Sequence, residues 1–246
     1  MPIISHTAGG GGGAPGGGDS TYTDTYANIP AASNDGDLFF PSDGAGVYRD
    51  TGAAWASWGP LMPFTEPPSA GWSWVNQGSA TIDATKGGIY LEDATGVATE
   101  IRGRFRSISA PYVVTAAFLR RAHYNANEEA AGICFRQSSD GKLITFQVRQ
   151  DYVIQVTKFS SPGTGVANYI STSWPTVLMP APVFVLRIED DNTNRKCYWS
   201  GDGQHFTLIH TVGRTDYLTA DEVGFNLYTH NAGVTHGEWL LSWAEA

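Results

Sequence analysis

Residues 132–149 read GICFRQSSDGKLITFQVR, two runs of mainly apolar side chains separated by a short polar turn. Asp140 and Gly141 stand between the runs, and an Asp-Gly pair in this position is the strongest short-range signal of a β-hairpin. We therefore expect antiparallel strands over 132–137 and 143–149. Helical periodicity is confined to residues 125–131 (NANEEAA), which form either a single helical turn or a polar loop.

Strand signals recur outward from this hairpin, at intervals of roughly 8 to 15 residues from residue 64 to the end. Residues 183–188 (VFVLRI) are apolar almost throughout, which is typical of a central strand covered on both faces. A second hairpin is expected across 200–203 (SGDG). The last strand, over 238–243, should place its alternate large side chains, Trp239, Leu241 and Trp243, on one face. These runs predict an all-β sandwich.

Composition agrees with this class and excludes others. The chain has 29 Gly, 13 Pro, 8 Trp, 11 Tyr and 11 Phe, and only 16% of its residues are charged, as many short strands and tight turns require. The net charge of -9 argues against a nucleic-acid partner. No apolar stretch reaches the roughly 20 residues of a membrane span. Cys134 and Cys197 lie inside strand-like runs, so we expect two buried thiols rather than a disulfide.

A small meander precedes the sandwich. Residues 36–60 read GDLFFPSDGAGVYRDTGAAWASWGP and predict short strands over 38–40, 47–49 and 55–58. A piece of this size cannot bury its large apolar side chains against itself. We therefore expect the following domain, a second copy of the chain or a larger assembly to cover five candidate assembly residues: Phe39, Phe40, Tyr48, Trp55 and Trp58.

The first residues form a glycine-rich segment. Residues 9–18 contain eight glycines, which predicts either a flexible linker or a leader that threads into a crowded groove of an assembly. Residues 60–68 carry four prolines and are expected to be a semi-rigid connection. The expected organisation is therefore an extended leader over 1–27, a β-meander adaptor over 28–63 and a sandwich over 64–246.

Two resemblances refine this outline. Residues 135–148 and 183–209, with the closing strands, resemble the concanavalin A-like lectin and glucanase jelly rolls, and the likeness extends over 64–246. The late hairpin with the pattern Ser-x-Asp-Gly-x-x-aromatic, at 200–206, is part of it. The resemblance implies a jelly-roll sandwich, but fold alone does not imply function.

Residues 28–60 resemble a short adaptor found near the N-terminus of many tailed-bacteriophage virion proteins. The matching residues are Ile29-Pro30-Ala31-Ala32, Gly36, Leu38-Phe39, Pro41, Asp43-Gly44, Tyr48-Arg49-Asp50, Gly52, Trp55 and Trp58-Gly59-Pro60. This likeness implies a virion structural protein made in the host cytoplasm, such as a head or tail fibre, a spike or a capsid decoration. It also implies attachment to other virion proteins through the N-terminal region, and a homo-oligomer, with a trimer favoured.

No catalytic motif stands out. The glucanase branch of the lectin-like fold carries Glu-x-Asp-x-x-Glu, and the nearest string is 189–194 (EDDNTN), in which Asn194 takes the place of the acid. A solvated turn is the better interpretation. Arg195 stands where an EF-hand calcium loop needs glycine. We expect no catalytic residue, no metal and no cofactor, and a glycan-cleaving enzyme is the least favoured alternative.

Binding to a host-surface glycan is the main alternative to a purely structural role. Arg102, Arg104 and Arg106 share one face of a strand, where they either meet acidic sugars or keep an outward face soluble. Four aromatic residues either stack on sugar rings or belong to the core: Trp72, Trp74, Tyr152 and Trp174.

Overall fold

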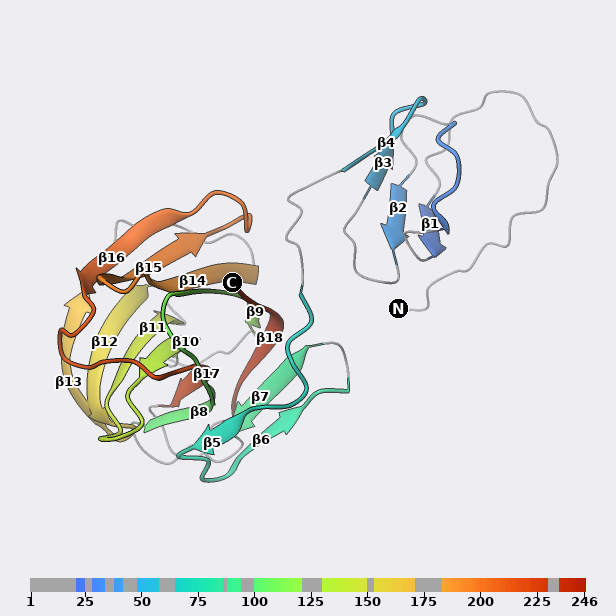
Figure 1. Ribbon diagram of the computed structural model, residues 1–246. Coiled ribbons are helices and arrows are strands. Elements are labelled where there is room, and N and C mark those ends of the chain that lie inside the picture. Colours follow the sequence, from blue (N-terminus) through green and yellow to red (C-terminus); the bar gives the residue numbers. More distant parts are fainter. Residues whose placement is uncertain are drawn as a thin grey trace. The chain divides into compact units, whose positions relative to one another are not determined.

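The computed structural model describes residues 21–24, 28–33, 38–41, 48–57, 65–85, 88–93, 100–120, 130–149, 153–170, 183–229 and 235–246. The chain divides into two compact units, residues 1–59 and 60–246 (Figure 1). In the described part of the chain, no helix is long and apolar enough to cross a membrane.

The N-terminal unit contains a four-stranded sheet within its described residues, in the order β1 (Thr21–Asp24), β2 (Leu38–Pro41), β3 (Tyr48–Asp50) and β4 (Trp55–Ser57). The expected antiparallel meander is confirmed in β2, β3 and β4. β1 is an addition, since it comes from the segment expected to be an extended leader and pairs with β2 in parallel. The glycine-rich residues 9–18 lie outside the described residues.

Asp50 and Trp55 hold the N-terminal unit together from inside. The buried Asp50 carboxylate accepts hydrogen bonds from the backbone N–H of Ser33 (2.6 Å) and of Gly52 (2.7 Å). The Trp55 ring N–H donates to the carbonyl oxygen of Pro30 at 2.6 Å. The segment before the meander therefore contributes to its packing.

The second unit is a sandwich of two antiparallel sheets, each with seven strands among the described residues. The first sheet has the order β13 (Thr164–Ile170), β12 (Ile154–Ser161), β11 (Leu143–Arg149), β10 (Ala130–Arg136), β17 (Glu222–Thr229), β8 (Glu100–Ser107) and β5 (Ser73–Val75). The second sheet has the order β16 (Thr207–Gly213), β15 (Asn194–Ser200), β14 (Val183–Asp190), β9 (Tyr112–Arg120), β18 (His236–Glu245), β7 (Ile89–Asp93) and β6 (Ala80–Asp83). The predicted all-β sandwich is confirmed.

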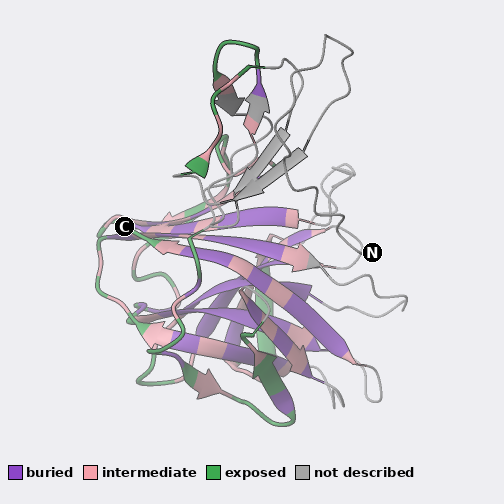
Figure 2. Ribbon diagram, turned by 90° about the vertical axis from the view of Figure 1, so that its right-hand side faces the viewer, coloured by how far each residue is buried: buried purple, intermediate pink, exposed green. Residues whose placement is uncertain are grey.

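Alternation along each strand decides which face meets the core (Figure 2). On β11, Ile144, Phe146 and Val148 join the main hydrophobic cluster between the sheets. Leu143 and Gln147 are also buried, but they lie on the outer face of the first sheet, meaning the face turned away from the second sheet. Side chains of a strand point alternately to the two faces, so this outer face has a composition of its own.

The two predicted hairpins are present. β10 and β11 pair in antiparallel fashion through the turn that contains Gly141, whose φ of 77° suits glycine. β15 and β16 pair across residues 201–206, and β14 lies inside the second sheet, between β15 and β9, as its apolar sequence predicts.

The last strand differs from the expectation. A β-bulge between Leu240 and Ser242 shifts the alternation of β18. Leu240 and Trp243 therefore both reach the core, while Trp239 packs against Tyr90 with ring centroids 4.7 Å apart. The prediction that Trp239, Leu241 and Trp243 share one face is wrong, because the bulge adds one residue between them.

Candidate functional site

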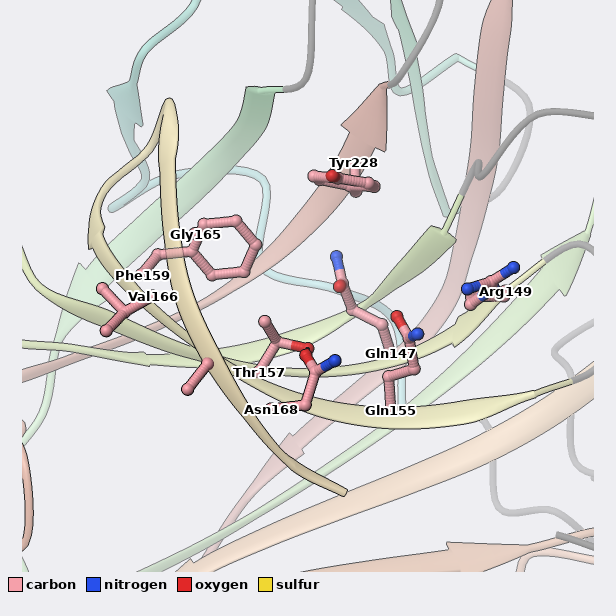
Figure 3. Close-up of a pocket in the computed structure, with 10 residues that line it drawn as sticks. Gln147, Arg149, Gln155, Thr157, Phe159, Gly165, Val166, Asn168 and Tyr228 are labelled. Carbon is pink, nitrogen blue, oxygen red and sulfur yellow. The ribbon is translucent and has the colours of Figure 1, made fainter. Parts of the chain in front are cut away.

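A pocket of about 340 Å³ lies on the outer face of the first sheet (Figure 3). Ten residues from β11, β12, β13 and β17 line it: Gln147, Arg149, Gln155, Thr157, Phe159, Gly165, Val166, Ala167, Asn168 and Tyr228. A volume of this order lies within the range of small-ligand pockets, which is about 300–1,000 Å³.

Strand register brings the polar residues of this face into one row across the sheet. Gln155 pairs with Gln147, Gln147 with Gly132, Gly132 with Asn226, and Asn226 with Gly103. Directly paired residues project from the same face of a sheet, about 5 Å apart. The side-chain amides of Gln155 and Gln147 are therefore neighbours, as Figure 3 shows.

Along most of its length the central strand β10 presents small side chains to this outer face, Ala130, Gly132 and Cys134, and Arg136 follows them at its end. A Cβ atom on Gly132 would lie 2.1 Å from the carbonyl oxygen of Phe146, so no larger residue fits there without a backbone shift. These small side chains leave space above β10, which side chains from the strands on either side can occupy.

Two aromatic rings lean over this space. Phe159 stands on β12 and Tyr228 on β17, and two strands separate them, a span of about 14 Å in a flat sheet. Their ring centroids are nevertheless 6.0 Å apart. The outer face is therefore hollow in cross-section, with Tyr228 half-buried at the rim and Phe159 buried.

Several buried polar atoms on this face lack hydrogen-bond partners among the described residues: Gln147 Nε2, Thr145 Oγ1 and Asn226 Nδ2. Gln147 is only 2% exposed, and in Figure 3 its amide rises into the pocket. A buried polar group without a partner costs about 1–3 kcal/mol. A ligand that supplies an acceptor to Gln147 would recover part of that cost.

Other polar groups of this face are paired. The Thr157 hydroxyl donates to Asn168 Oδ1 at 2.7 Å, and the Cys134 thiol donates to Asn226 Oδ1 at 2.6 Å. Burial raises the pKa of the Cys134 thiol well above its usual range, so this group remains a protonated donor.

No aspartate or glutamate is among the ten residues that line the pocket, and Arg149 is the charged side chain among them. Glycoside hydrolysis by the common route requires two carboxylates that flank the scissile bond. The described lining therefore provides contacts for binding and lacks the carboxylate pair for this chemistry. Among the described residues, no group of three or more His, Cys, Asp or Glu is arranged to hold a metal ion.

A smaller hollow of about 160 Å³ lies on the outer face of the second sheet. Its lining consists of Thr65, Thr115, Ala117, Val185, Arg187, Gly203, Ser242 and Ala244. Arg187 is already engaged there, because its guanidinium lies 3.5 Å from the ring centroid of Phe206 and its Nε donates to Thr115 Oγ1 at 2.9 Å. This hollow offers fewer polar groups to a ligand than the pocket on the first sheet.

The three arginines of β8 do not form an outward binding face. Register pairs Arg102 with Leu227, Arg104 with Phe225 and Arg106 with Val223, and these partners belong to the core. Arg102 is 4% exposed. The expectation that this face meets water or ligand is wrong for Arg102, because both faces of β8 are covered.

Each of these arginines has partners at the side of the sandwich. Arg102 pairs with Asp93 and Glu100, and Arg106 pairs with Glu245 at 3.3 Å. The Arg104 and Arg106 guanidiniums lie 4.9 Å and 5.4 Å from the ring centroids of Trp74 and Trp72 respectively. The ion pairs of Arg102 and Arg106 link the two sheets, whereas the Arg104–Trp74 contact lies within the first sheet.

Trp72 is part of the core. Its ring meets Phe225 and Trp243 edge to face, with centroids 5.0 Å and 4.9 Å apart, and only 9% of the residue is exposed. Stacking on a sugar requires an accessible ring face, so the candidate role of Trp72 is wrong. Trp74 packs partly buried against the same core, and Tyr152 and Trp174 lie outside the described residues.

The candidate assembly residues are placed in part. Tyr48 and Trp55 are half-buried within the N-terminal unit. Phe39 and Phe40 belong to β2, but their side chains, like Trp58, lie outside the described residues.

Within the acidic string at 189–194, residues 191–193 form the expected turn, while Glu189 and Asp190 end β14 and Asn194 begins β15. Asp191 accepts hydrogen bonds from the backbone N–H of Thr193 and Asn194. Asp190 is an exception to the solvated interpretation, because it is fully buried and pairs with Arg214 at 3.1 Å.

Sequence reasoning missed the pocket residues. Gln147, Gln155 and Thr157 occupy the polar positions of alternating strands, and that alternation is the one signal they leave in the sequence. Their convergence with Asn168 and Tyr228 depends on strand order, which alternation does not specify.

No protein-family model matches the chain, and no curated protein matches it. Solved structures with a similar arrangement include a protein of unknown function from Saccharomyces cerevisiae (13% identity, TM-score 0.47, covering 72% of this chain and 96% of that one). The seed lectin of Lotus tetragonolobus is another, with 11% identity, a TM-score of 0.47, and coverage of 74% and 95%. The GH43 protein BlXynB of Bacillus licheniformis has 13% identity and a TM-score of 0.48, and the match covers 81% of this chain but 42% of that one.

Proposed function

We propose that this chain is a carbohydrate-binding protein whose sandwich holds a saccharide in the pocket on the outer face of the first sheet. The observation that carries the proposal is the combination of a half-buried aromatic ring, Tyr228, with the amides of Gln147, Gln155 and Asn168 in one hollow. Sugars present an apolar C–H face that packs on aromatic rings and hydroxyl groups that bond to amides.

We propose that the pocket binds its saccharide without cleaving it. The absence of a carboxylate among its described lining residues supports this reading. A sensitive assay for release of reducing ends from candidate polysaccharides tests it. Cleavage that survives purification and is lost on substitution in the pocket would overturn the proposal of a non-enzymatic protein.

Glycan-array screening of the full chain, followed by calorimetric titration of the best ligand, tests the binding proposal. We expect Tyr228→Ala and Gln155→Ala each to weaken binding at least tenfold. Tyr198→Ala is the matched control, since Tyr198 lies on the outer face of the second sheet, and it should bind as the wild type does. Failure to bind any saccharide, or equal binding by the pocket variants, would refute the proposal.

We propose in addition that the protein works as a virion component of a tailed bacteriophage, anchored through its N-terminal unit to other virion proteins. The resemblance of residues 28–60 to phage adaptors supports this, as does the division of the chain into compact units at residues 59 and 60. In this role the sandwich would present its saccharide site to the host surface.

Light scattering on the full chain and on residues 60–246 tests the assembly part of this proposal. We expect a closed homo-oligomer, with a trimer favoured, for the full chain and a monomer for the shorter one. A full chain that stays monomeric at high concentration would contradict the anchoring role while leaving saccharide binding intact.

A further inference from the structure

The hairpin of β12 and β13 reaches across the outer face of the first sheet. β11, β10 and β17 separate β12 from β8, which is a distance of about 19 Å in a flat sheet. The backbone N–H of Ile101, on β8, nevertheless donates to the carbonyl oxygen of Pro162, in the hairpin turn, at 2.8 Å. The first sheet is therefore curled around its outer face, and the hairpin turn closes the curl against β8.

Buried apolar side chains fill the curl beside this contact. Five of them form a cluster that is separate from the main core: Ile101, Phe105, Cys134, Leu143 and Phe159. Tyr228 packs against this cluster, and its ring meets that of Phe159 edge to face, with centroids 6.0 Å apart. The packed rings prevent a saccharide chain from passing between the hairpin and β17.

The pocket ends at these rings. Gln155, Thr157 and Phe159 are alternate residues of β12 that all line it, so the pocket extends about 13 Å along this strand. Figure 3 shows Gln155 at one end and Phe159 at the other, close to Gly165 of the hairpin. The Phe159 end is therefore blind, and a ligand must enter from another side.

The most deeply buried amide of the pocket also favours an inserted ligand. Gln147 is 2% exposed, and its Nε2 lacks an acceptor among the described residues. A chain that lay across the rim would not reach an amide at this depth, whereas a sugar unit inside the hollow would offer it a hydroxyl oxygen. The volume of about 340 Å³ lies near the lower limit for small-ligand pockets, which suits a short piece of saccharide.

A blind pocket can receive the end of a chain, whereas an internal segment needs an exit on both sides. Resting on the proposed saccharide site, we propose that the pocket binds the terminal, non-reducing unit of a glycan, inserted end-on toward Phe159. The unit packs its C–H face on the Tyr228 ring, and its hydroxyl groups bond to the amides of Gln147 and Asn168. Glycans on a cell surface are attached through their reducing ends, which leaves the non-reducing end free to enter.

A glycan array that presents each common hexose, deoxyhexose, hexosamine and pentose in two positions tests this inference with the full-length protein. In the first position the unit is the non-reducing terminus of a chain attached through its reducing end. In the second position one further sugar is added to it, so that the unit becomes internal. We expect at least one unit to bind as the terminus and to lose at least tenfold in affinity as an internal unit. Lengthening the chain at its reducing end from three to six units should change the affinity less than twofold.

Phe159→Ala opens the blind end and should let an extended chain pass. We expect the difference in affinity between the terminal and internal positions to fall from at least tenfold to less than threefold. Phe206→Ala is the matched control, because it removes a ring that lies over Arg187 on the second sheet, and it should keep the full difference. Thermal unfolding checks that each variant is folded.

Gly165→Ala gives an independent readout with little risk to the fold. A Cβ atom on Gly165 would lie 3.7 Å from the Phe159 ring, an ordinary contact, and it would occupy space at the blind end. We expect affinity for the terminal unit to fall at least threefold. Gly213→Ala is the matched control, since a Cβ atom there meets nothing within 4 Å, and it should bind as the wild type does.

The outcomes separate this inference from the proposed function. Equal binding of a unit in the terminal and internal positions would overturn end-on recognition and leave saccharide binding standing. A terminal preference that persists in folded Phe159→Ala, or unchanged affinity in Gly165→Ala, would overturn the assignment of that preference to the blind end. Absence of binding to every unit in both positions would refute the proposed function itself.

Discussion

Arg102 on β8 and Asp93 on β7 form an ion pair that joins the two sheets of the sandwich, with Arg102 Nε 3.2 Å from Asp93 Oδ2. The side chains of Arg102 and Asp93 are 5% and 0% exposed, respectively. Arg102 also donates to the carbonyl oxygen of Asn76 at 3.1 Å. This pair therefore closes one side of the core with charges instead of apolar side chains.

Loss of one partner should be costly. Arg102→Ala leaves the buried Asp93 carboxylate with fewer partners, and we expect the free energy of unfolding to fall by about 3–5 kcal/mol, measured by urea denaturation. The double variant Arg102→Met with Asp93→Leu should recover most of that loss, because it removes both charges. A single variant as stable as the wild type would show that the pair carries little of the sheet-to-sheet linkage.

Trp72 should matter for stability and not for ligand binding. Trp72→Ala removes a ring that packs between Phe225 and Trp243, and a loss of about 3–5 kcal/mol is expected in the same denaturation experiment. The milder Trp72→Phe should stay folded and bind saccharide with unchanged affinity. Weakened binding by a fully folded Trp72→Phe protein would argue that Trp72 takes part in the site after all.

The two thiols should be unreactive in the folded protein. Cys134 and Cys197 are free and buried, as the sequence predicts, and burial raises the pKa of Cys197 to about 12. Thiolate is the reactive form, so a thiol reagent at pH 8 should label neither residue until denaturant is added, and then both. Rapid labelling of the native protein would mean that at least one thiol is accessible.

Acid should weaken the hairpin turns of the second sheet. The Lys196 ammonium, with backbone N–H groups, holds the pKa of Asp191 at about 2, below the 3.8 of an unperturbed carboxyl. The backbone N–H of His205, with its imidazole, lowers the pKa of Asp202 as well. Carboxyls whose pKa is lower in the folded state stabilise it above pH 3.8 and lose that contribution as the pH falls toward 2.

The measurement is the thermal unfolding midpoint between pH 5 and pH 2. Asp202→Asn should lower the midpoint at pH 5 and flatten its fall below pH 4, since the titrating group is gone. Glu66→Gln, at an exposed position before β5, is a control for a general change in charge. An identical pH profile for the wild type and Asp202→Asn would contradict this account of the turn.

Much of the sandwich could be predicted because local signals decide it. Asp140 and Gly141 predict the β10–β11 hairpin, and the apolar run of β14 predicts an interior strand. Alternation failed where tertiary structure covers both faces of a strand. On β8, Ile101 and Phe105 pack on the outer face with Cys134 and Leu143, so the arginines had to point inward.

The candidate site was less accessible to prediction. Gln147 and Tyr228 are far apart in sequence and belong to strands that are not paired with each other. Only strand order and register place them in one hollow, and neither can be predicted from the alternation of polar and apolar residues. The bulge in β18, which brings Leu240 and Trp243 together in the core, likewise could not be predicted from the alternation.

One wall of the pocket is an edge strand, β13, which pairs only with β12 among the described strands. Its residues 164–168 are exposed, and Val166 is 55% exposed. In the proposed saccharide site, substitutions there would touch the ligand but hardly touch the core, so they should be tolerated during evolution. Selection could therefore alter which sugar the proposed site recognises by changing β13, while β10 and β11 remain constrained by packing.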